Sequence, residues 1–134
     1  MRDLFKFIVN SVFIYTLLSL QLAHADIARS QLTSAIEARE PTDDLTDFVQ
    51  GKAGEITTVY FFNHVTKMNG QTVVHKWFLN GEEKAVVQLP IGSDNWRTYS
   101  SKRLNSVLQG QWEVQVWVNN EQRQAHRFTF EIRD

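Results

Sequence analysis

The stretch that decides the fold is Thr72–Leu79 (TVVHKWFL), followed by Asn80-Gly81 and then by Lys84–Ile91 (KAVVQLPI). Both runs are rich in β-branched or apolar residues, as strands with a buried face are. The Asn80-Gly81 pair favours a type I′ hairpin turn, because both central residues of that turn need positive φ. The stretch therefore predicts a β-hairpin. Pro90 has no N–H to donate, so the second strand is expected to be an edge strand or to end there.

Four more runs of strand character surround this hairpin: Thr57–Asn63, Asn95–Arg103, Gln111–Val118 and Ala125–Ile132. Residues 119–122 (NNEQ) separate the last two runs and predict a second hairpin turn. Short strands at regular spacing, separated by polar turns, are typical of an all-β sandwich or barrel. Residues 41–55 hold three aspartates and two glycines and predict a long connecting loop.

Ala28–Arg39 has two readings. Its apolar residues have helical spacing and Pro41 would end such a helix. With period two, Ala28, Leu32 and Ile36 also share one face, which would make the segment a further strand. The periodicity alone does not choose between the two, so the count of strands is six or seven.

The first 25 residues have the pattern of a secretory signal peptide. Arg2 and Lys6 form a basic lead, residues 7–20 are almost unbroken apolar sequence, and Ala23-His24-Ala25 is an A-x-A cleavage site. A membrane span needs about 20 apolar residues, and this run is shorter and interrupted by polar residues. We expect cleavage near Ala25, a single domain over residues 26–134 and a periplasmic or secreted location. Retention of the segment as an anchor is the alternative.

Composition limits the classes of partner. Removal of residues 1–25 takes Lys and Arg from 14 to 12 and Asp and Glu from 15 to 14, which leaves a net charge of −2. Binding of nucleic acid or of an anionic membrane needs a basic face, so neither partner is expected, and neither is membrane insertion of the mature chain. The chain has no cysteine, which excludes disulfides, thiolate chemistry, cysteine metal sites and a lipid-modified cysteine.

Several tracts together resemble a known family. They are Arg39-Glu40-Pro41, Val59–Phe62, Gly70–Trp77, Trp96–Lys102 and Gly110–Val114. Their order and spacing are similar to those of the bacterial domain-of-unknown-function family 2914, over nearly the whole mature chain. The resemblance implies an exported or membrane-tethered β-domain and brings no activity, ligand or catalytic residue. It favours a strand at Ala28–Arg39, and seven strands in this order suit an immunoglobulin-like or fibronectin-type sandwich.

Strand parity predicts the core. Side chains on a strand alternate between two faces, so Trp77 points with Val73, His75 and Leu79. A tryptophan on the third strand of such a sandwich usually fills the core. The predicted core residues are Trp77, Trp112, Phe128 and Phe130.

The opposite parity predicts a binding face. If the third, fourth and sixth strands are neighbours, the outward residues form one apolar patch with a polar rim, a combination that often marks a partner site. We name this the Trp117 face, and its residues are Val74, Lys76, Phe78, Val86, Gln115, Trp117 and Arg127. In the alternative, the loop of residues 41–54 covers Trp117, or Trp117 lies singly under Arg127 as a cation–π contact.

The residues that invite a catalytic or metal reading have structural explanations. His75 and His126 show neither H-x-H nor H-x-x-x-H spacing, and a strand is expected to lie between them. Ser100 and Lys102 share a face, but a serine–lysine pair also needs a desolvated lysine and an oxyanion hole. We therefore expect no catalytic residue, no metal and no cofactor.

These observations predict a non-catalytic extracytoplasmic binding or adaptor domain that acts through one sheet face. Its partner would be an envelope protein or a cell-wall glycan. A glycan would make the chain a carbohydrate-binding module that stacks the sugar on Trp117. An enzyme, the third class, would need a concave pocket that gathers Ser100, Lys102 or His75.

Overall fold

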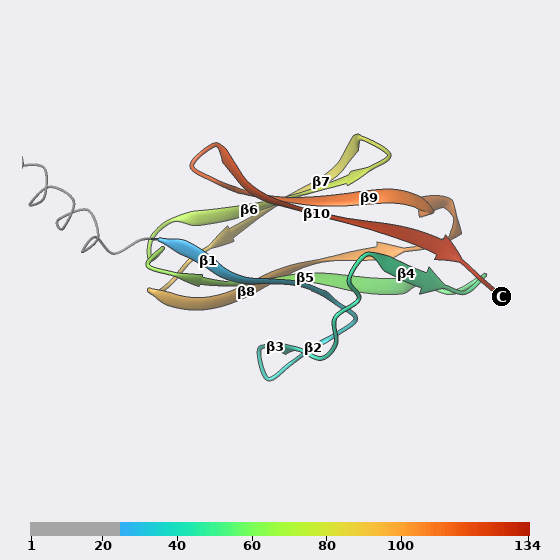
Figure 1. Ribbon diagram of the computed structural model, residues 1–134, viewed down its shortest axis with the longest axis horizontal. Helices are drawn as coiled ribbons and strands as arrows, with labels where there is room; N and C mark the ends of the chain where they lie inside the picture. The colour runs from blue at the N-terminus through green and yellow to red at the C-terminus, as the bar shows by residue number, and fades with distance from the viewer. Residues whose placement is uncertain (1–24) are drawn as a thin grey trace, which may run out of the picture.

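Two β-sheets lie face to face in the computed structural model, which describes residues 25–134 (Figure 1). One sheet has three strands in the order β1 (Asp26–Thr33), β5 (Thr57–Thr66) and β8 (Asn95–Leu104). The other has five, in the order β4 (Phe48–Gly51), β10 (Glu121–Ile132), β9 (Gly110–Val118), β6 (Thr72–Leu79) and β7 (Glu82–Pro90). All neighbouring strands are antiparallel except β4, which runs parallel to β10. The predicted all-β sandwich is confirmed.

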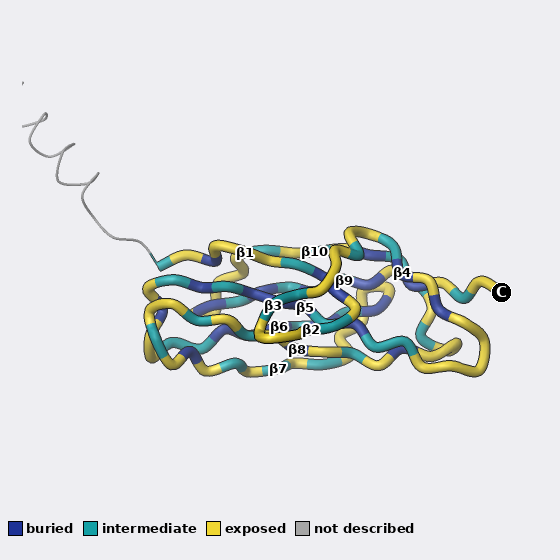
Figure 2. Tube along the Cα trace, turned by 90° about the horizontal axis from the view of Figure 1, so that it is seen from below, coloured by how far each residue is buried: buried dark blue, intermediate teal, exposed yellow. Residues whose placement is uncertain are grey.

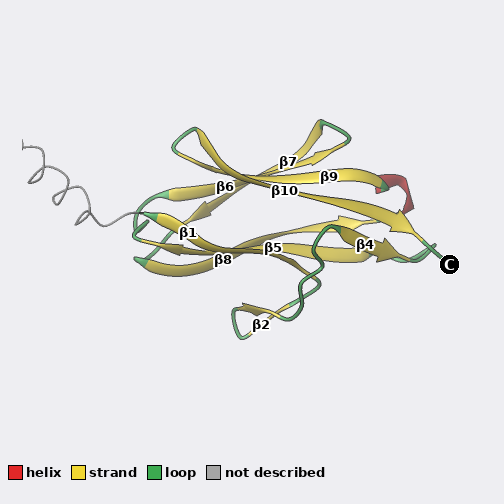
Figure 3. Ribbon diagram, in the orientation of Figure 1, coloured by secondary structure: helices red, strands yellow, loops and turns green. Residues whose placement is uncertain are grey.

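Two small elements complete the structure. A hairpin of β2 (Ile36–Glu37) and β3 (Glu40–Pro41) projects from the three-stranded sheet, on the side away from the other sheet (Figure 1). A single turn of 3₁₀-helix, Ser106–Leu108, connects β8 to β9 (Figure 3). The hairpin stands over the outer face of the three-stranded sheet (Figure 1).

The predicted hairpins form where the turn chemistry places them. Asn80 and Gly81 connect β6 to β7 with φ values of 49° and 84°, as a type I′ turn requires. Asn119 and Asn120 connect β9 to β10 with φ values of 52° and 60°. Pro90 is the last residue of β7, which pairs with β6 alone and is an edge strand.

The sandwich has eight strands, three in one sheet and five in the other, against the six or seven that the sequence predicts. β4 lies within residues 41–55, which were expected to form a loop; it places Val49 in the core and pairs with the end of β10. Four residues are too few for their alternation to stand out in the sequence. Ala28–Arg39 is strand, as the family resemblance favours, but only to Thr33, after which the chain turns into the β2–β3 hairpin.

Parity decides which side chains fill the space between the sheets. Trp77, Trp112, Phe128 and Phe130 are all at most 2% exposed, and the turns and the C-terminal end are mostly exposed (Figure 2). Trp112 stacks on Phe128 with 6.2 Å between ring centroids, and Trp77 meets both rings edge-on at 6.5 Å. Such pairs add about 0.5–1.5 kcal/mol beyond their burial, so these rings form the centre of the core.

The predicted signal peptide lies outside the described residues, apart from Ala25. Within the part of the chain that the structure describes, no helix has the length and apolar character needed to cross a bilayer.

Candidate functional site

The Trp117 face is assembled as the strand order requires. β6 lies between β7 and β9, so the three strands expected to be neighbours are neighbours. Trp117 is directly opposite Val74, and Lys76 has Val86 on one side and Gln115 on the other. Val86 is 50% exposed, and the other residues of the face on β6 and β9 are half-buried.

The cation beside Trp117 is Lys76. Its Nζ lies 3.9 Å from the centroid of the Trp117 ring, within the range of a cation–π contact. The Trp117 Nε1 donates to Gln115 Oε1 at 2.9 Å. The indole is therefore held in place by two neighbours on its own sheet.

Arg127 lies at the other end of the face. It pairs across the strands with Glu113, and its Nε is 3.9 Å from Glu113 Oε1. Glu113 and Trp117 are four positions apart on β9, which is about 13 Å along a strand. The alternative in which Arg127 covers Trp117 is therefore wrong, because the register pairs Trp117 with Gln122.

His75 and Ser100, from different sheets, meet in the core. His75 Nδ1 lies 2.6 Å from Ser100 Oγ, and His75 Nε2 lies 2.6 Å from Asn63 Oδ1. His75 and Asn63 are fully buried and Ser100 is 5% exposed. Burial lowers the pKa of His75 to about 4, because the charged imidazolium would lose its hydration. The imidazole is thus neutral near pH 7.

A serine beside a histidine is the arrangement of a nucleophile and its base. Here the Ser100 hydroxyl also accepts a hydrogen bond from Trp77 Nε1 at 3.0 Å, and all three side chains lie between the sheets. A substrate would have to enter the core to reach Ser100. Lys102 is half-buried on the same strand, but the hydrogen bonds of Ser100 go to His75 and Trp77.

His126 lies apart from His75. Its strand β10 is separated from β6 by β9, and its Nε2 bonds to the Thr46 carbonyl oxygen. Among residues 25–134, no three His, Asp or Glu side chains gather as a metal site would require.

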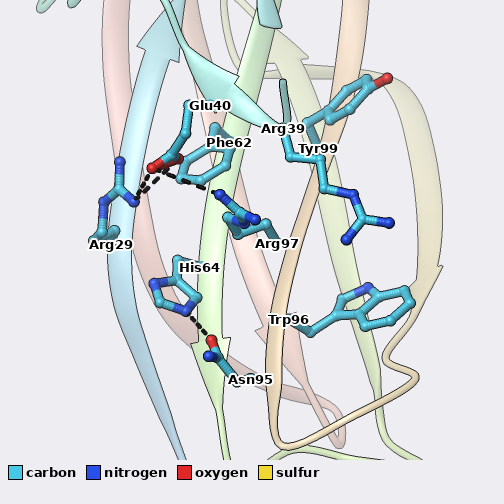
Figure 4. A pocket seen from close by; sticks show the side chains of 9 residues that line it. All are labelled: Arg29, Arg39, Glu40, Phe62, His64, Asn95, Trp96, Arg97 and Tyr99. Atoms are coloured by element: carbon cyan, nitrogen blue, oxygen red, sulfur yellow. Dashed lines mark hydrogen bonds and ion pairs between the residues drawn. The ribbon is translucent and has the colours of Figure 1, made fainter. Parts of the chain in front are cut away.

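The structure adds a cavity that is absent from the predictions made above from the sequence. It lies on the outer face of the three-stranded sheet, under the β2–β3 hairpin, and has a volume of about 490 Å³ (Figure 4). Its lining residues are mostly cationic or aromatic: Arg29, Arg39, Glu40, Phe62, His64, Asn95, Trp96, Arg97 and Tyr99.

Two ion pairs of Glu40 attach the hairpin to the sheet. Arg29 Nη1 donates to both oxygens of Glu40, at 3.0 and 3.1 Å, and Arg97 Nη1 lies 3.8 Å from Glu40 Oε1. The hydrogen bond from Arg29, aided by the charges of Arg29 and Arg97, lowers the pKa of Glu40. The Arg29 guanidinium also covers the Phe62 ring at 5.0 Å, and Phe62 is buried although it lies outside the main core.

The base of the hairpin is closed by Asp43. Its carboxylate accepts from Thr33 Oγ1 at 2.7 Å, from the Ser34 amide at 2.8 Å and from Ser34 Oγ at 2.5 Å. Burial alone would raise the pKa of Asp43, but these hydrogen bonds outweigh it and lower the pKa. The turn itself contains Ala38 and Arg39, with φ values of 49° and 65°.

Part of the cavity could be found in the sequence. On β8, Arg97 and Tyr99 share the parity opposite to buried Ser100, which predicts an outward cationic and aromatic pair. No sequence pattern places Arg39 and Glu40 above that strand, because their position depends on a hairpin fixed by tertiary ion pairs.

The fold and these sites define an immunoglobulin-like β-sandwich domain. The crystal structure of an immunoglobulin-like protein from Pseudomonas aeruginosa is similar, with a TM-score of 0.56, 11% identity, and coverage of 83% of this chain and 99% of that one. A CARDB domain from Pyrococcus furiosus, solved in complex with di-metal ions, has a TM-score of 0.51 and 9% identity, with 85% of this chain and 99% of that one covered. At such identities the likeness concerns the fold alone.

The family model described as "Protein of unknown function (DUF2914)" matches residues 70–132. The resemblance to family 2914 is thereby confirmed over β6 to β10, just under half of the chain. The tracts at residues 39–41 and 59–62 precede the matched range. No curated protein matches the sequence.

Proposed function

We propose that this chain is a non-catalytic extracytoplasmic binding or adaptor domain of the bacterial envelope, and that it binds an envelope protein through the Trp117 face. The observation that carries the proposal is the 50% exposure of Val86 directly beside Lys76, whose ammonium lies over the Trp117 ring. An exposed apolar centre with a polar rim is the usual anatomy of a protein-binding surface.

The contacts of the face support a protein partner. Burial of Val86 and of the exposed parts of Trp117 and Phe78 would supply apolar area, at about 25 cal/mol per Å² before the costs of association. The Lys76 ammonium lies over the indole, from where it could turn to a carboxylate of the partner. Lys76 and Arg127 would then fix the orientation of the partner, since Lys76 pairs with Gln115 and Arg127 with Glu113, which places them two positions apart on the register of β9.

The second candidate, a carbohydrate-binding module, has less support at this face. A sugar ring that stacks on Trp117 would have to share the indole with Lys76, whose Nζ is 3.9 Å from the ring centroid. A sugar ligand thus needs to displace a cation–π contact worth about 0.5–1 kcal/mol at an exposed site.

A non-catalytic role is supported by the location of the groups that could carry chemistry. His75 and Ser100 are enclosed between the sheets, and both already have hydrogen-bond partners there. The extracytoplasmic location is supported by the signal-peptide pattern of residues 1–25, with cleavage proposed near Ala25.

The test is a comparison of two substitutions at exposed valines. Val86→Asp places a charge on the face at the edge strand β7, beside Lys76, and Val107→Asp places the same charge at a position that is 80% exposed on the 3₁₀ turn. The tagged chains, immobilised at equal density, are incubated with envelope extract, and the captured proteins are quantified by mass spectrometry. We expect Val86→Asp and Trp117→Ala to lose at least about tenfold of a protein that Val107→Asp retains. Equal capture by all variants would refute the proposal, and loss of binding to a purified cell-wall glycan instead would favour the carbohydrate-binding module.

A further inference from the structure

The cavity under the β2–β3 hairpin is on the opposite sheet from the Trp117 face, so what it binds is independent of the proposed function. Its volume of about 490 Å³ falls within the range of about 300–1,000 Å³ that is usual for small-molecule sites. The cavity is therefore large enough for a ligand of the size of one or two sugar rings.

The lining carries more positive than negative charge. It contains three guanidinium groups and one carboxylate, that of Glu40. Arg29 donates two hydrogen bonds to the Glu40 carboxylate. Arg97 Nη1 is 3.8 Å from Glu40 Oε1, which is too long for a hydrogen bond. Among residues 25–134, Arg39 is in no ion pair. The donors of Arg39 and Arg97 are thus available to an anion.

Two aromatic rings, those of Trp96 and Tyr99, line the cavity on the side of the Arg39 guanidinium (Figure 4). In Figure 4 the Arg39 guanidinium extends away from Glu40, to the side of the cavity where Trp96 and Tyr99 lie. Tyr99 is 47% exposed and its ring is supported edge-on by Tyr60 at 5.7 Å. A Cβ at Gly92 would lie 3.0 Å from the Trp96 ring, so that ring packs closely on backbone. Tyr99 therefore offers exposed surface to a ligand, while Trp96 is half-buried against the core and lines the cavity with the part of its ring that remains accessible.

Two polar side chains complete the lining. His64 Nε2 is hydrogen-bonded to Asn95 Oδ1, and both residues line the cavity (Figure 4). The Asn95 amide nitrogen and the second ring nitrogen of His64 keep hydrogen-bonding capacity for hydroxyl groups.

We propose that this cavity binds a carboxylated sugar of the hexuronic acid type. Its carboxylate pairs with the planar guanidinium groups of Arg39 and Arg97, which match two coplanar oxygens. Its ring lies against Trp96 and Tyr99, and its hydroxyls bond to His64 and Asn95. This class of ligand uses each of the three features that the lining combines.

The backbone conformation of the β2–β3 turn determines which substitution of Arg39 is suitable. Its φ of 65° is in the left-handed region, which asparagine tolerates better than most residues. Arg39→Asn therefore removes the guanidinium while the turn is retained. Arg103 is a matched control, because it lies on β8 with the same parity as Arg97, about 20 Å away along the strand.

The test measures binding of glucuronate to the whole chain by NMR titration at low salt. Glucose and inorganic phosphate are the comparison ligands. We expect glucuronate to shift the indole resonance of Trp96 and to bind at least about tenfold more tightly than glucose or phosphate. Arg39→Asn and Tyr99→Ala should each raise the Kd for glucuronate at least about fivefold while the melting temperature stays unchanged. Arg103→Gln should bind glucuronate with a Kd within about twofold of that of the wild type.

Three results would overturn the assignment. They are absence of glucuronate binding, phosphate or glucose binding as tight as glucuronate, and equal effects of Arg39→Asn and Arg103→Gln. Capture of envelope proteins by the Trp117 face is measured separately, so failure of one experiment leaves the other interpretable.

Discussion

His75 and Ser100 connect the two sheets through a hydrogen bond of 2.6 Å between the imidazole Nδ1 and the hydroxyl oxygen. The bond belongs to a chain in which each donor meets an acceptor. Trp77 Nε1 donates to Ser100, Ser100 to His75, and His75 Nε2 to Asn63 Oδ1. The chain continues from the Asn63 amide to Ser30 Oγ at 2.8 Å, and from Ser30 to Gln124 Oε1 at 2.5 Å. Because buried polar groups are costly without partners, this chain favours a single alignment of β6 against β8.

The buried imidazole makes stability depend on pH. The pKa of His75 is lowered to about 4 in the folded state, against about 6.5 in the unfolded chain. Above pH 6.5 both states are neutral and the free energy of unfolding is unaffected by this group. As the pH decreases from 6.5 to about 4, His75 gains a proton in the unfolded chain but not in the folded one. The contribution of His75 to the free energy of unfolding therefore falls by about 1.4 kcal/mol for each pH unit. Urea unfolding at several pH values measures the slope.

The control for this slope is His75→Gln, which can donate to Asn63 and accept from Ser100 without a titrating group. The variant should lose the contribution of His75 to the slope between pH 6.5 and 4, whatever its stability at pH 7. An unchanged slope in His75→Gln would mean that other groups cause the dependence.

Removal of the Ser100 hydroxyl should be expensive. Ser100→Ala leaves His75 Nδ1 and Trp77 Nε1 without their partner in a site that is closed to water. Each unsatisfied buried group costs about 1–3 kcal/mol, so we expect a loss of about 2–4 kcal/mol in the free energy of unfolding. Ser101→Ala is the control, since Ser101 is exposed on the same strand and should change stability by less than about 0.5 kcal/mol. Equal effects of the two variants in urea unfolding would show that the chain of hydrogen bonds adds no stability.

Alternation along strands accounts for most of what could be predicted from the sequence. It places Trp77 and Trp112 in the core and Trp117 on the opposite face, because β6 and β9 are regular over their whole length. The turn at Asn80-Gly81 could be predicted for a similar reason, as few other residues adopt positive φ at low cost. Local rules suffice where the structure is locally determined.

The remainder depends on contacts between segments far apart in the sequence. The partner of Trp117 is Lys76 rather than Arg127 because of the register between β6, β9 and β10, which no single strand encodes. The pairing of His75 with Ser100 requires two sheets to be aligned, and the cavity requires the β2–β3 hairpin to be attached by Glu40. These contacts join residues that are far apart in the sequence. A sequence pattern can therefore indicate the individual residues but not which of them come together.

The Asp43 carboxylate should control the order of the β2–β3 hairpin. Asp43→Asn keeps the shape but weakens the hydrogen bonds from Thr33 and Ser34, which are stronger to a charged acceptor. We expect faster amide hydrogen exchange in residues 34–42, with a loss of about 1–2 kcal/mol in global stability. Asp44→Asn is the control, because among residues 25–134 the Asp44 carboxylate accepts a hydrogen bond only from the backbone amide of Thr46, within the loop. Similar rates of amide hydrogen exchange in residues 34–42 of the two variants would contradict a role of the Asp43 carboxylate in ordering the hairpin.

The junction of β4 with β10 should not tolerate a side chain at residue 51. A Cβ at Gly51 would lie 2.8 Å from Cε1 and Cζ of Phe130 and 3.0 Å from Cδ1 of Ile132. Phe130 is 1% exposed, and side chains in a close-packed core have little room to move. Gly51→Ala should therefore lower the free energy of unfolding by about 1–3 kcal/mol, as overpacking of a core does. Gln50→Ala, at the exposed neighbouring position of the same strand, should change it by less than about 0.5 kcal/mol. Thermal unfolding compares the variants, and a melting temperature of Gly51→Ala equal to that of Gln50→Ala would mean that β4 is free to move away from Phe130.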